Sequence, residues 1–218
     1  METAHVDTFA RDHLPPRAQW PDLLFTLPEL DYAERMNAAV ELLDGRFDER
    51  PCIHGDDETW TYAELRDRAE RIAGVLVDDM GLVPGNRVLL HGPNTRDLLA
   101  CWFGIVLAGG VVVATMPLLR ERELSKVIAK AEVSHGLVDA RVAGEAVSAQ
   151  AEQPVLRELL TFGPGGELEE RAAAKPAGFE AVETHAEDVA LIAFTSGTAG
   201  EPKGCVHMHR DLLSLIHI

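Results

Sequence analysis

Residues 85–119 read GNRVLLHGPNTRDLLACWFGIVLAGGVVVATMPLL. The stretch begins with an apolar strand pattern at Arg87–His91, and Asn94 then provides a capped helix start. A largely apolar helix is expected at 96–108, and the β-branched run Val111–Thr115 comes next. A strand, a buried helix and a second strand that is apolar on both faces predict two parallel strands joined by a crossover helix.

The uncharged part of this stretch is long enough to span a membrane. Residues 98–119 contain no Asp, Glu, Lys or Arg over 22 positions. The pair Gly109-Gly110 divides the run, and Pro117 interrupts it again. Because the composition also changes at the glycines from helix-like to strand-like, we expect a buried helix and a buried strand, without a membrane span.

The alternation of strand and helix continues on both sides of this stretch. Upstream, Thr61 and Glu64 form a capping box at the start of an amphipathic helix. Downstream, an amphipathic helix at 121–132 leads to a short strand at His135–Asp139, and the last clear strand covers 188–195. The sequence therefore predicts an α/β fold, with a parallel sheet and helices on both faces.

The remaining segments give weaker patterns. Residues 52–61 predict a short hairpin, and 32–43 predict a helix in an otherwise irregular N-terminal region. Residues 140–153 are expected to be helical and 155–162 to form a strand, although charges interrupt that strand pattern. Gly, Pro, Ala and Glu dominate 163–184, which we interpret as a mobile connection.

Composition excludes several classes of protein. The chain of 218 residues carries a formal net charge of −16, so nothing suggests the basic face of a nucleic-acid-binding protein. Cys52, Cys101 and Cys205 have no paired spacing, which argues against a disulfide framework and against a zinc site. The N-terminus is polar, unlike a secretory signal. We expect a cytoplasmic protein with reduced thiols.

The candidate chemistry is concentrated in the loop TSGTAGEPKG, residues 195–204, which follows the last predicted strand. Its glycines let the backbone approach a ligand closely, and successive backbone N–H groups can form a nest for an anion. Its hydroxyl groups add donors, and Lys203 adds a positive charge. This combination predicts a polyphosphate-binding loop. Its candidate binding residues are Thr195, Ser196, Gly197, Thr198, Gly200 and Lys203.

Two alternatives explain this loop less well. A plain surface turn needs glycine and proline, but not three hydroxyl groups and a lysine crowded behind an apolar strand. The P-loop of NTPases has a glycine where this chain has Pro202, and a metal-binding hydroxyl where it has Gly204. The residues that follow also resemble a strand, whereas a P-loop opens a helix.

Three residues near the loop are weaker candidates. His207 and His209 alternate like metal ligands, but no third ligand is identifiable nearby, so an ordinary structural role is favoured. Cys205 has no neighbouring base that would activate a nucleophile, and we expect it to be packed. The sequence therefore assigns no residue to catalysis and none to a metal ion.

The loop resembles the signature TSGTTGxPKG of the adenylate-forming (AMP-binding) enzymes at nine of ten positions, with Ala199 in place of a threonine. Residues 59–76 resemble the early hairpin and helix of this family, and 85–119 resemble its first strand, helix and strand. Within the family, PPRAQWPDLL near the start and HMHRDLL near the end are most similar to the benzoate- and 2-aminobenzoate-CoA ligases.

The resemblance implies an acyl-CoA synthetase that activates a carboxylate in two steps. The carboxylate attacks the α-phosphate of ATP, with Mg²⁺ shielding the charge, to give an acyl-adenylate and pyrophosphate. Coenzyme A then displaces AMP to give the thioester. The loop residues matched above would hold the β- and γ-phosphates, and Ala199 leaves one hydroxyl missing. An aromatic acid is the favoured substrate.

The resemblance also implies a domain organisation. Residues 1–50 form an irregular and helical N-terminal segment, and 51–218 form a partial AMP-binding domain that ends just after the phosphate-binding loop. The acyl pocket, the magnesium-binding glutamate, the ribose-binding aspartate and the C-terminal domain of the family all lie beyond this loop. We therefore expect a truncated N-terminal fragment that is inactive alone. The alternative is a non-catalytic module that binds a nucleotide or a partner.

Overall fold

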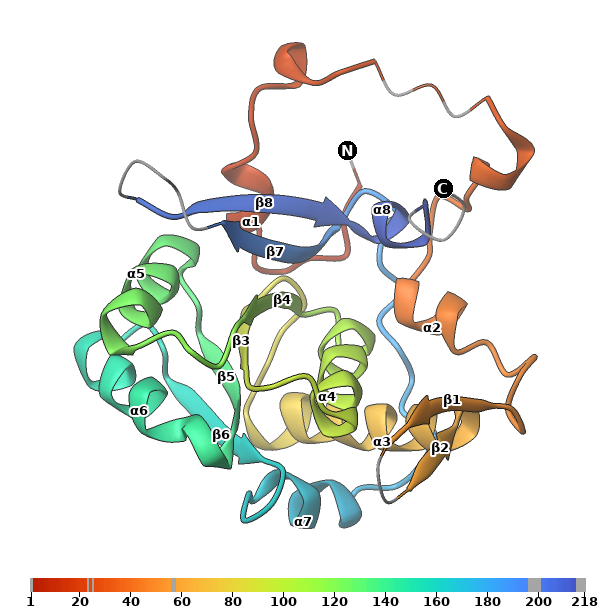
Figure 1. The fold of residues 1–218 in the computed structure, drawn as a ribbon. Coiled ribbons are helices and arrows are strands. Elements are labelled where there is room, and N and C mark those ends of the chain that lie inside the picture. The colour runs from red at the N-terminus through yellow and green to blue at the C-terminus, as the bar shows by residue number, and fades with distance from the viewer. Residues whose placement is uncertain (1, 23, 25, 56–57, 196–200, 215–218) are drawn as a thin grey trace.

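The computed structural model describes residues 2–22, 24, 26–55, 58–195 and 201–214. In this part of the chain, a six-stranded sheet has the strand order β6-β5-β3-β4-β7-β8 (Figure 1). Its strands are β3 (Arg87–His91), β4 (Val111–Thr115), β5 (His135–Asp139), β6 (Glu158–Phe162), β7 (Val189–Thr195) and β8 (Lys203–Met208). All neighbouring strands pair in parallel except β8, which is antiparallel to β7.

The predicted parallel sheet is thus confirmed from β3 to β7, and β8 departs from it. Only seven residues separate the end of β7 at Thr195 from the start of β8 at Lys203. A crossover between parallel strands needs about a dozen residues or more, so this short connection permits antiparallel pairing only. The final two strands therefore form a hairpin at the edge of the sheet.

Strand β3 lies at the centre of the sheet and is buried along its whole length. Leu90 pairs with Ala114 of β4 on one side and with Leu137 of β5 on the other. Val88 and Leu90 pack into the hydrophobic cluster on one face, whereas Leu89 packs into the cluster on the opposite face. Burial on both faces explains why this segment reads as a continuous apolar run instead of alternating.

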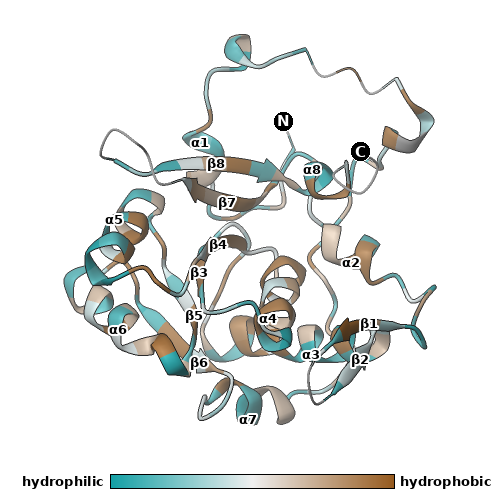
Figure 2. Ribbon diagram, viewed as in Figure 1, coloured by the Kyte–Doolittle hydropathy of each residue, from teal (hydrophilic) through white to brown (hydrophobic). Residues whose placement is uncertain are grey.

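Helices cover both faces of the sheet (Figure 1). One layer contains α3 (Tyr62–Gly74), α4 (Arg96–Leu107) and α7 (Leu168–Ala173). The other contains α1 (Phe9–Asp12), α5 (Glu121–Ala131) and α6 (Ala143–Glu152). Figure 2 shows hydrophilic residues on the outer sides of α5 and α6, as expected for amphipathic helices that cover a buried sheet.

The smaller elements lie around this three-layered core. The hairpin predicted at 52–61 is confirmed, since β1 and β2 pair antiparallel, and its Asp56 and Asp57 lie outside the described residues. These elements are β1 (Pro51–His54), β2 (Thr59–Thr61), α2 (Ala38–Leu42), α8 (His209–Ser214), a π-helical extension of α3 (Val75–Asp79) and 3₁₀ turns at Arg17–Gln19, Pro28–Leu30 and Ala140–Val142.

Side-chain caps fix the starts of α3 and α4. The capping box at α3 is confirmed: the Glu64 N–H donates to Thr61 Oγ1 at 3.3 Å, and the Thr61 N–H donates to Glu64 Oε2 at 2.8 Å. At α4 the cap is Thr95 and not Asn94, because the Leu98 N–H donates to Thr95 Oγ1 at 3.2 Å. The threonine directly precedes the first helical residue, which is the position that an N-cap requires.

The helix predicted at 32–43 is much shorter than expected, since α2 covers only Ala38–Leu42. The preceding backbone is held by the segment that leads into β7, where the Met36 N–H donates to the Thr184 carbonyl at 2.8 Å. The Thr184 hydroxyl donates in turn to the Met36 carbonyl at 2.6 Å. These contacts between distant parts of the chain override the local helical pattern.

Residues 163–184 include helix α7, which the sequence does not predict. Leu168 and Ala172 are buried in the cluster that α3 and α4 share. Farther along, the Val182 N–H donates to the Leu107 carbonyl at 2.9 Å. The interpretation of 163–184 as a mobile connection did not include this helix. Two buried apolar side chains dock the segment, and two are too few to form a periodic pattern in the sequence.

The long uncharged stretch at 98–119 contains most of α4, followed by β4, as predicted. Within the described ranges, no helix is long and apolar enough to cross a membrane. The weaker predictions also hold with shorter bounds, since α6 covers Ala143–Glu152 and β6 covers Glu158–Phe162.

Gly104 marks the place where α4 crosses α3. A Cβ atom at this position would lie 2.7 Å from Ile72 Cγ2 and 3.0 Å from the Ala69 carbonyl oxygen, and the backbone oxygen cannot rotate away. We expect Gly104→Ala to lower the free energy of unfolding by about 1–3 kcal/mol, although alanine favours a helix. The measurement is urea unfolding followed by circular dichroism.

Gly144→Ala in α6 is the matched control, because no atom lies within 4 Å of the added Cβ. It should stabilise the protein by up to about 1 kcal/mol through helix propensity alone. The same change in stability for both variants would contradict the close crossing of α3 and α4.

Candidate functional site

The hairpin of β7 and β8 brings together the two described ends of the predicted phosphate loop. Thr195 is the last residue of β7 and Lys203 is the first of β8. The antiparallel ladder pairs these two residues, and both are exposed. The other candidates lie outside the described residues and remain predictions: Ser196, Gly197, Thr198 and Gly200.

The sheet places this hairpin beside the carboxyl end of β4. Strand β7 pairs in parallel with β4 through Leu191 and Val112, so Thr195 and Thr115 end at the same edge of the sheet. In open α/β sheets, ligands bind outside the carboxyl ends of the strands. The two described ends of the loop therefore lie at the edge where this architecture places a binding site.

A cavity of about 680 Å³ lies at this edge, between the end of β4, helix α5 and the β7–β8 hairpin. Thr195 and Pro202, the residues near the two ends of the loop, both line it. Its complete lining is Ala114, Thr115, Met116, Leu119, Arg122, Glu123, Lys126, Val127, Phe194, Thr195 and Pro202. A volume of this size lies within the range of small-molecule sites.

Helix α5 contributes two positive charges and one negative charge, Glu123, to the cavity, and no pattern in the sequence alone indicates that they belong to the site. Arg122 and Lys126 are four residues apart, so they lie on one face of the helix. Lys126 Nζ lies 3.1 Å from Glu201 Oε1, which ties α5 to the loop. Their spacing of four residues indicates in the sequence that they share a helix face. Only the position of β4 next to β7 shows that this face lies beside the ends of the loop.

A buried histidine orients one polar group of the cavity. His91 at the end of β3 is fully buried, and its Nδ1 shares a hydrogen bond of 2.9 Å with Thr115 Oγ1. Burial lowers the pKa of His91 below its ordinary value, so the ring is neutral at pH 7. The Thr115 side chain, which lines the cavity, is therefore held by an uncharged partner.

A second buried histidine anchors the hairpin from behind. The ring Nδ1 of His209, at the start of α8, accepts a hydrogen bond from the Ala38 N–H at 3.1 Å, and the backbone N–H of His209 donates to the Asp188 carbonyl at 3.1 Å. Burial lowers the pKa of His209 to about 3, so the ring is a neutral acceptor at pH 7. It thereby fixes α8 against α2 and the start of β7.

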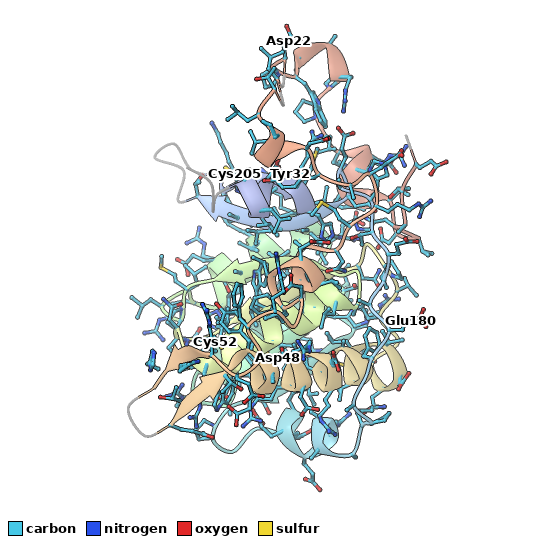
Figure 3. The ribbon with its side chains drawn as sticks, turned by 90° about the vertical axis from the view of Figure 1, so that its right-hand side faces the viewer. Asp22, Tyr32, Asp48, Cys52, Glu180 and Cys205 are labelled. Carbon is cyan, nitrogen blue, oxygen red and sulfur yellow. The ribbon has the colours of Figure 1, made fainter. Side chains whose placement is uncertain are left out.

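The metal-ligand alternative for His207 and His209 finds no support in the described ranges. No three His, Cys, Asp or Glu side chains within these ranges are grouped so that they could hold a metal ion. The prediction for Cys205 is wrong, since its side chain is exposed and not packed (Figure 3). Strand β8 forms the edge of the sheet, where residues have fewer neighbours than in the central strands.

The described structure is thus a mostly parallel α/β sheet whose last two strands form a hairpin at the carboxyl edge, with Lys203 at the start of the second strand. Residues 43–218 match the family of AMP-binding enzymes. The chain is 31% identical over 195 residues to a benzoate–CoA ligase of Thauera aromatica, an alignment that covers 86% of this chain and 37% of that ligase.

Two solved structures share the fold. The anthranilate CoA ligase AuaEII in complex with anthranoyl-AMP superposes with a TM-score of 0.79 at 22% identity, over 85% of this chain and 37% of that one. ATP-bound MatB from Rhodopseudomonas palustris superposes with a TM-score of 0.74 at 30% identity, over 82% of this chain and 36% of that one. The chain belongs to the AMP-binding enzyme family, and it spans little more than a third of the length of these relatives.

The buried His209 makes the stability of the protein depend on pH. Its pKa is about 3 in the folded protein and near 6.5 in the unfolded chain, so its stabilising effect is complete above pH 6.5 and is lost as the pH falls towards 3. In His209→Asn, the amide oxygen can still accept from Ala38 but does not titrate. We expect the free energy of unfolding to fall by about 2 kcal/mol less in this variant between pH 7 and pH 5.

Urea unfolding at both pH values provides the measurement. His54→Asn is the control, because His54 lies exposed on β1, and it should reproduce the pH dependence of the parent. An unchanged pH dependence in His209→Asn would show that this ring already titrates freely in the folded protein.

Proposed function

We propose that the chain provides the phosphate-binding part of an ATP-dependent ligase that joins a carboxylate to coenzyme A. The loop holds the β- and γ-phosphates of ATP through Thr195, Ser196, Gly197, Thr198, Gly200 and Lys203. The observation that carries this proposal is the cavity beside the loop, which Thr195 and Pro202 line together with Arg122 and Lys126 of α5.

The described residues of the site suit a triphosphate. Although the whole chain has a net charge of −16, Arg122 and Lys126 both line the cavity, where Glu123 and Glu201, the partner of Lys126, offset part of their charge. Lys203 begins the adjoining strand. Phosphate oxygens accept hydrogen bonds from hydroxyl groups and from the N–H groups of cationic side chains. The relative MatB, which is 30% identical, has been solved with ATP bound. The chain offers no described metal cluster, so none of these residues is assigned to Mg²⁺.

The loop acts on the leaving group of the first reaction. A carboxylate oxygen attacks the α-phosphorus of ATP, and the bond from that phosphorus to the bridging oxygen breaks. The bridging oxygen leaves with the electron pair, as part of pyrophosphate. Fixed donors on the β- and γ-phosphates align this departing group and stabilise the negative charge that develops on it. In the second reaction, the thiol of coenzyme A attacks the acyl carbon and AMP departs.

The substrate that we favour is a small aromatic carboxylate, because a relative that is 31% identical is a benzoate–CoA ligase. This chain covers 37% of that ligase, so we assign it the binding of phosphates and no catalytic residue. We place the protein in the cytoplasm. We expect the isolated chain to bind the nucleotide without catalysing a reaction. A non-catalytic module that binds a nucleotide or a partner is the alternative that activity measurements distinguish.

The phosphate contacts can be tested on the 218-residue chain itself. Lys203→Ala should weaken the binding of ATP and of tripolyphosphate by about 10–100-fold, the effect of losing one charged hydrogen bond. AMP binding should change little, since AMP lacks the β- and γ-phosphates. Lys130→Ala removes the same charge from an exposed position of α5 outside the cavity lining, and it should keep the affinity of the parent. Titration calorimetry measures all three proteins. Equal affinities would overturn the assignment of the loop.

Catalysis separates the ligase from the alternative module. The 218-residue chain should show no exchange of labelled pyrophosphate into ATP with benzoate or 2-aminobenzoate. Fusion to the remaining segment of the Thauera aromatica ligase should restore exchange. In this fusion, Lys203→Ala should slow adenylate formation by about 10²–10³-fold, with a smaller effect on the thioester step. Nucleotide binding without exchange in the fusion would favour the non-catalytic module.

A further inference from the structure

One ion pair joins helix α5 to the β8 end of the phosphate loop, beside the cavity. Nζ of Lys126 lies 3.1 Å from Oε1 of Glu201. Figure 1 shows α5 next to the end of the hairpin at which β7 ends and β8 begins. Glu201 directly precedes Pro202, which lines the cavity together with Lys126. The pair therefore connects a wall of the cavity to the segment that is proposed to bind phosphate.

Helix α5 anchors the lysine of this pair. Leu124 and Ile128, on either side of Lys126, are fully buried in the hydrophobic cluster on this face of the sheet. The start of the helix is tied to α6, because the Glu121 N–H donates to Glu145 Oε2 at 2.9 Å. The backbone of Lys126 is thus held in place, whereas its flexible four-carbon stem lets the ammonium group change partner.

The ion pair itself is exposed and easily exchanged. The side chain of Lys126 is 37% exposed and that of Glu201 is 72% exposed. Ion pairs that solvent reaches this freely contribute little to stability, because water and salt screen the attraction between the charges. An anion that attracts Lys126 more strongly than Glu201 does would therefore displace the carboxylate at little cost.

The charges around the cavity are balanced while this pair is intact. Arg122 and Lys126 line the cavity, and so does Glu123. Glu123 also serves the helix, since its Oε2 accepts a hydrogen bond from the Arg120 N–H at 2.9 Å. With Glu201 next to Lys126, two cations face two carboxylates. The balance becomes positive when Glu201 turns away, so the position of this one side chain changes how strongly the cavity attracts an anion.

A triphosphate is a stronger partner for Lys126 than Glu201 is. Carboxylate and phosphate oxygens both accept charged hydrogen bonds from an ammonium group, so one can take the place of the other. A triphosphate carries several negative charges and a carboxylate carries one, and the attraction grows with the charge. Arg122, which lies one helical turn before Lys126, also lines the cavity and adds to this attraction.

We propose that Glu201 competes with the triphosphate for Lys126, which makes Lys126 a further phosphate-binding residue. This inference rests on the proposed function of the loop. Without nucleotide, Lys126 pairs with Glu201. When the β- and γ-phosphates bind, Lys126 donates to a phosphate oxygen and the Glu201 carboxylate turns to solvent. After the first reaction, Glu201 pairs with Lys126 again and thereby promotes the release of pyrophosphate.

Glu201→Gln tests this competition in the 218-residue chain, with tripolyphosphate as the probe and titration calorimetry as the measurement. Glutamine keeps the shape of the side chain and removes its charge. Tripolyphosphate should therefore bind about two- to fivefold more tightly, the change expected when an exposed ion pair no longer has to be broken. Pyrophosphate should gain by a similar factor. Affinities no higher than those of the parent would overturn the proposal.

Lys126→Met tests the lysine, since methionine keeps an apolar stem and lacks the charge. It should weaken tripolyphosphate binding about tenfold or more, as expected for the loss of a charged hydrogen bond. Lys130→Met is the matched control, because Lys130 is exposed one turn farther along α5 and lies outside the cavity lining. It should bind as the parent does. Equal affinities of the two variants would refute the role of Lys126.

The double variant separates competition from general repulsion. In the Lys126→Met background, Glu201→Gln should no longer strengthen binding, because it has no cation to release. Glu123→Gln is the comparison: it removes a carboxylate that lines the same cavity, and glutamine can still cap α5. Its effect should be the same with and without Lys126. An equal gain from Glu201→Gln in both backgrounds would show repulsion alone and overturn the competition.

Lys203→Ala distinguishes a failure of this inference from a failure of the proposed function. If Lys203→Ala weakens tripolyphosphate binding and Glu201→Gln binds as the parent does, the function of the loop is supported and the competition is refuted. If the parent binds no tripolyphosphate, or if Lys203→Ala binds it equally well, the proposed function fails and this inference fails with it.

Discussion

The parallel pairing of β3 with β4 on one side and β5 on the other is the interaction on which the rest of the structure depends. It buries β3 on both faces, so a layer of helices must cover each face of the sheet. It also brings the carboxyl ends of the strands to one edge. Because β7 joins this sheet beside β4, Thr195 reaches the same edge as Thr115. The candidate phosphate site is therefore a consequence of strand order, before any side chain of the loop is considered.

The sequence predicts what is local and repetitive. The alternation of strands and helices, the capping box at Thr61 and the helix and strand within 98–119 all follow from patterns that neighbouring residues complete. Helix α7 escapes such patterns because two buried side chains dock it. The extended backbone before α2 escapes them because its partner, Thr184, is distant in the sequence. The same limit applies to the site: the loop signature is visible in the sequence, whereas Arg122 and Lys126 gain their meaning only from the adjacency of β4 and β7.

Net charge and local charge differ in this protein, and both bear on its chemistry. A net charge of −16 disfavours the approach of an anion from a distance. The cavity beside the loop nevertheless contains Arg122 and Lys126, although Glu123 also lines it and Lys126 pairs with Glu201. Anion binding at such sites rests on short-range hydrogen bonds and exclusion of water, and less on long-range attraction.

Strand β8 has β7 as its one partner strand in the described part of the chain. Its outer edge consequently presents backbone N–H and C=O groups in a row, the pattern from which a sheet grows by adding a strand. Growth at this edge would leave the loop free, because the loop joins β7 and β8 at their ends and not along their sides. A strand added there would pair with β8 on its second side and restrict the motion of Lys203, without contact to the loop. A strand that pairs with the outer edge of β8 could therefore restrict the motion of the hairpin that carries the loop.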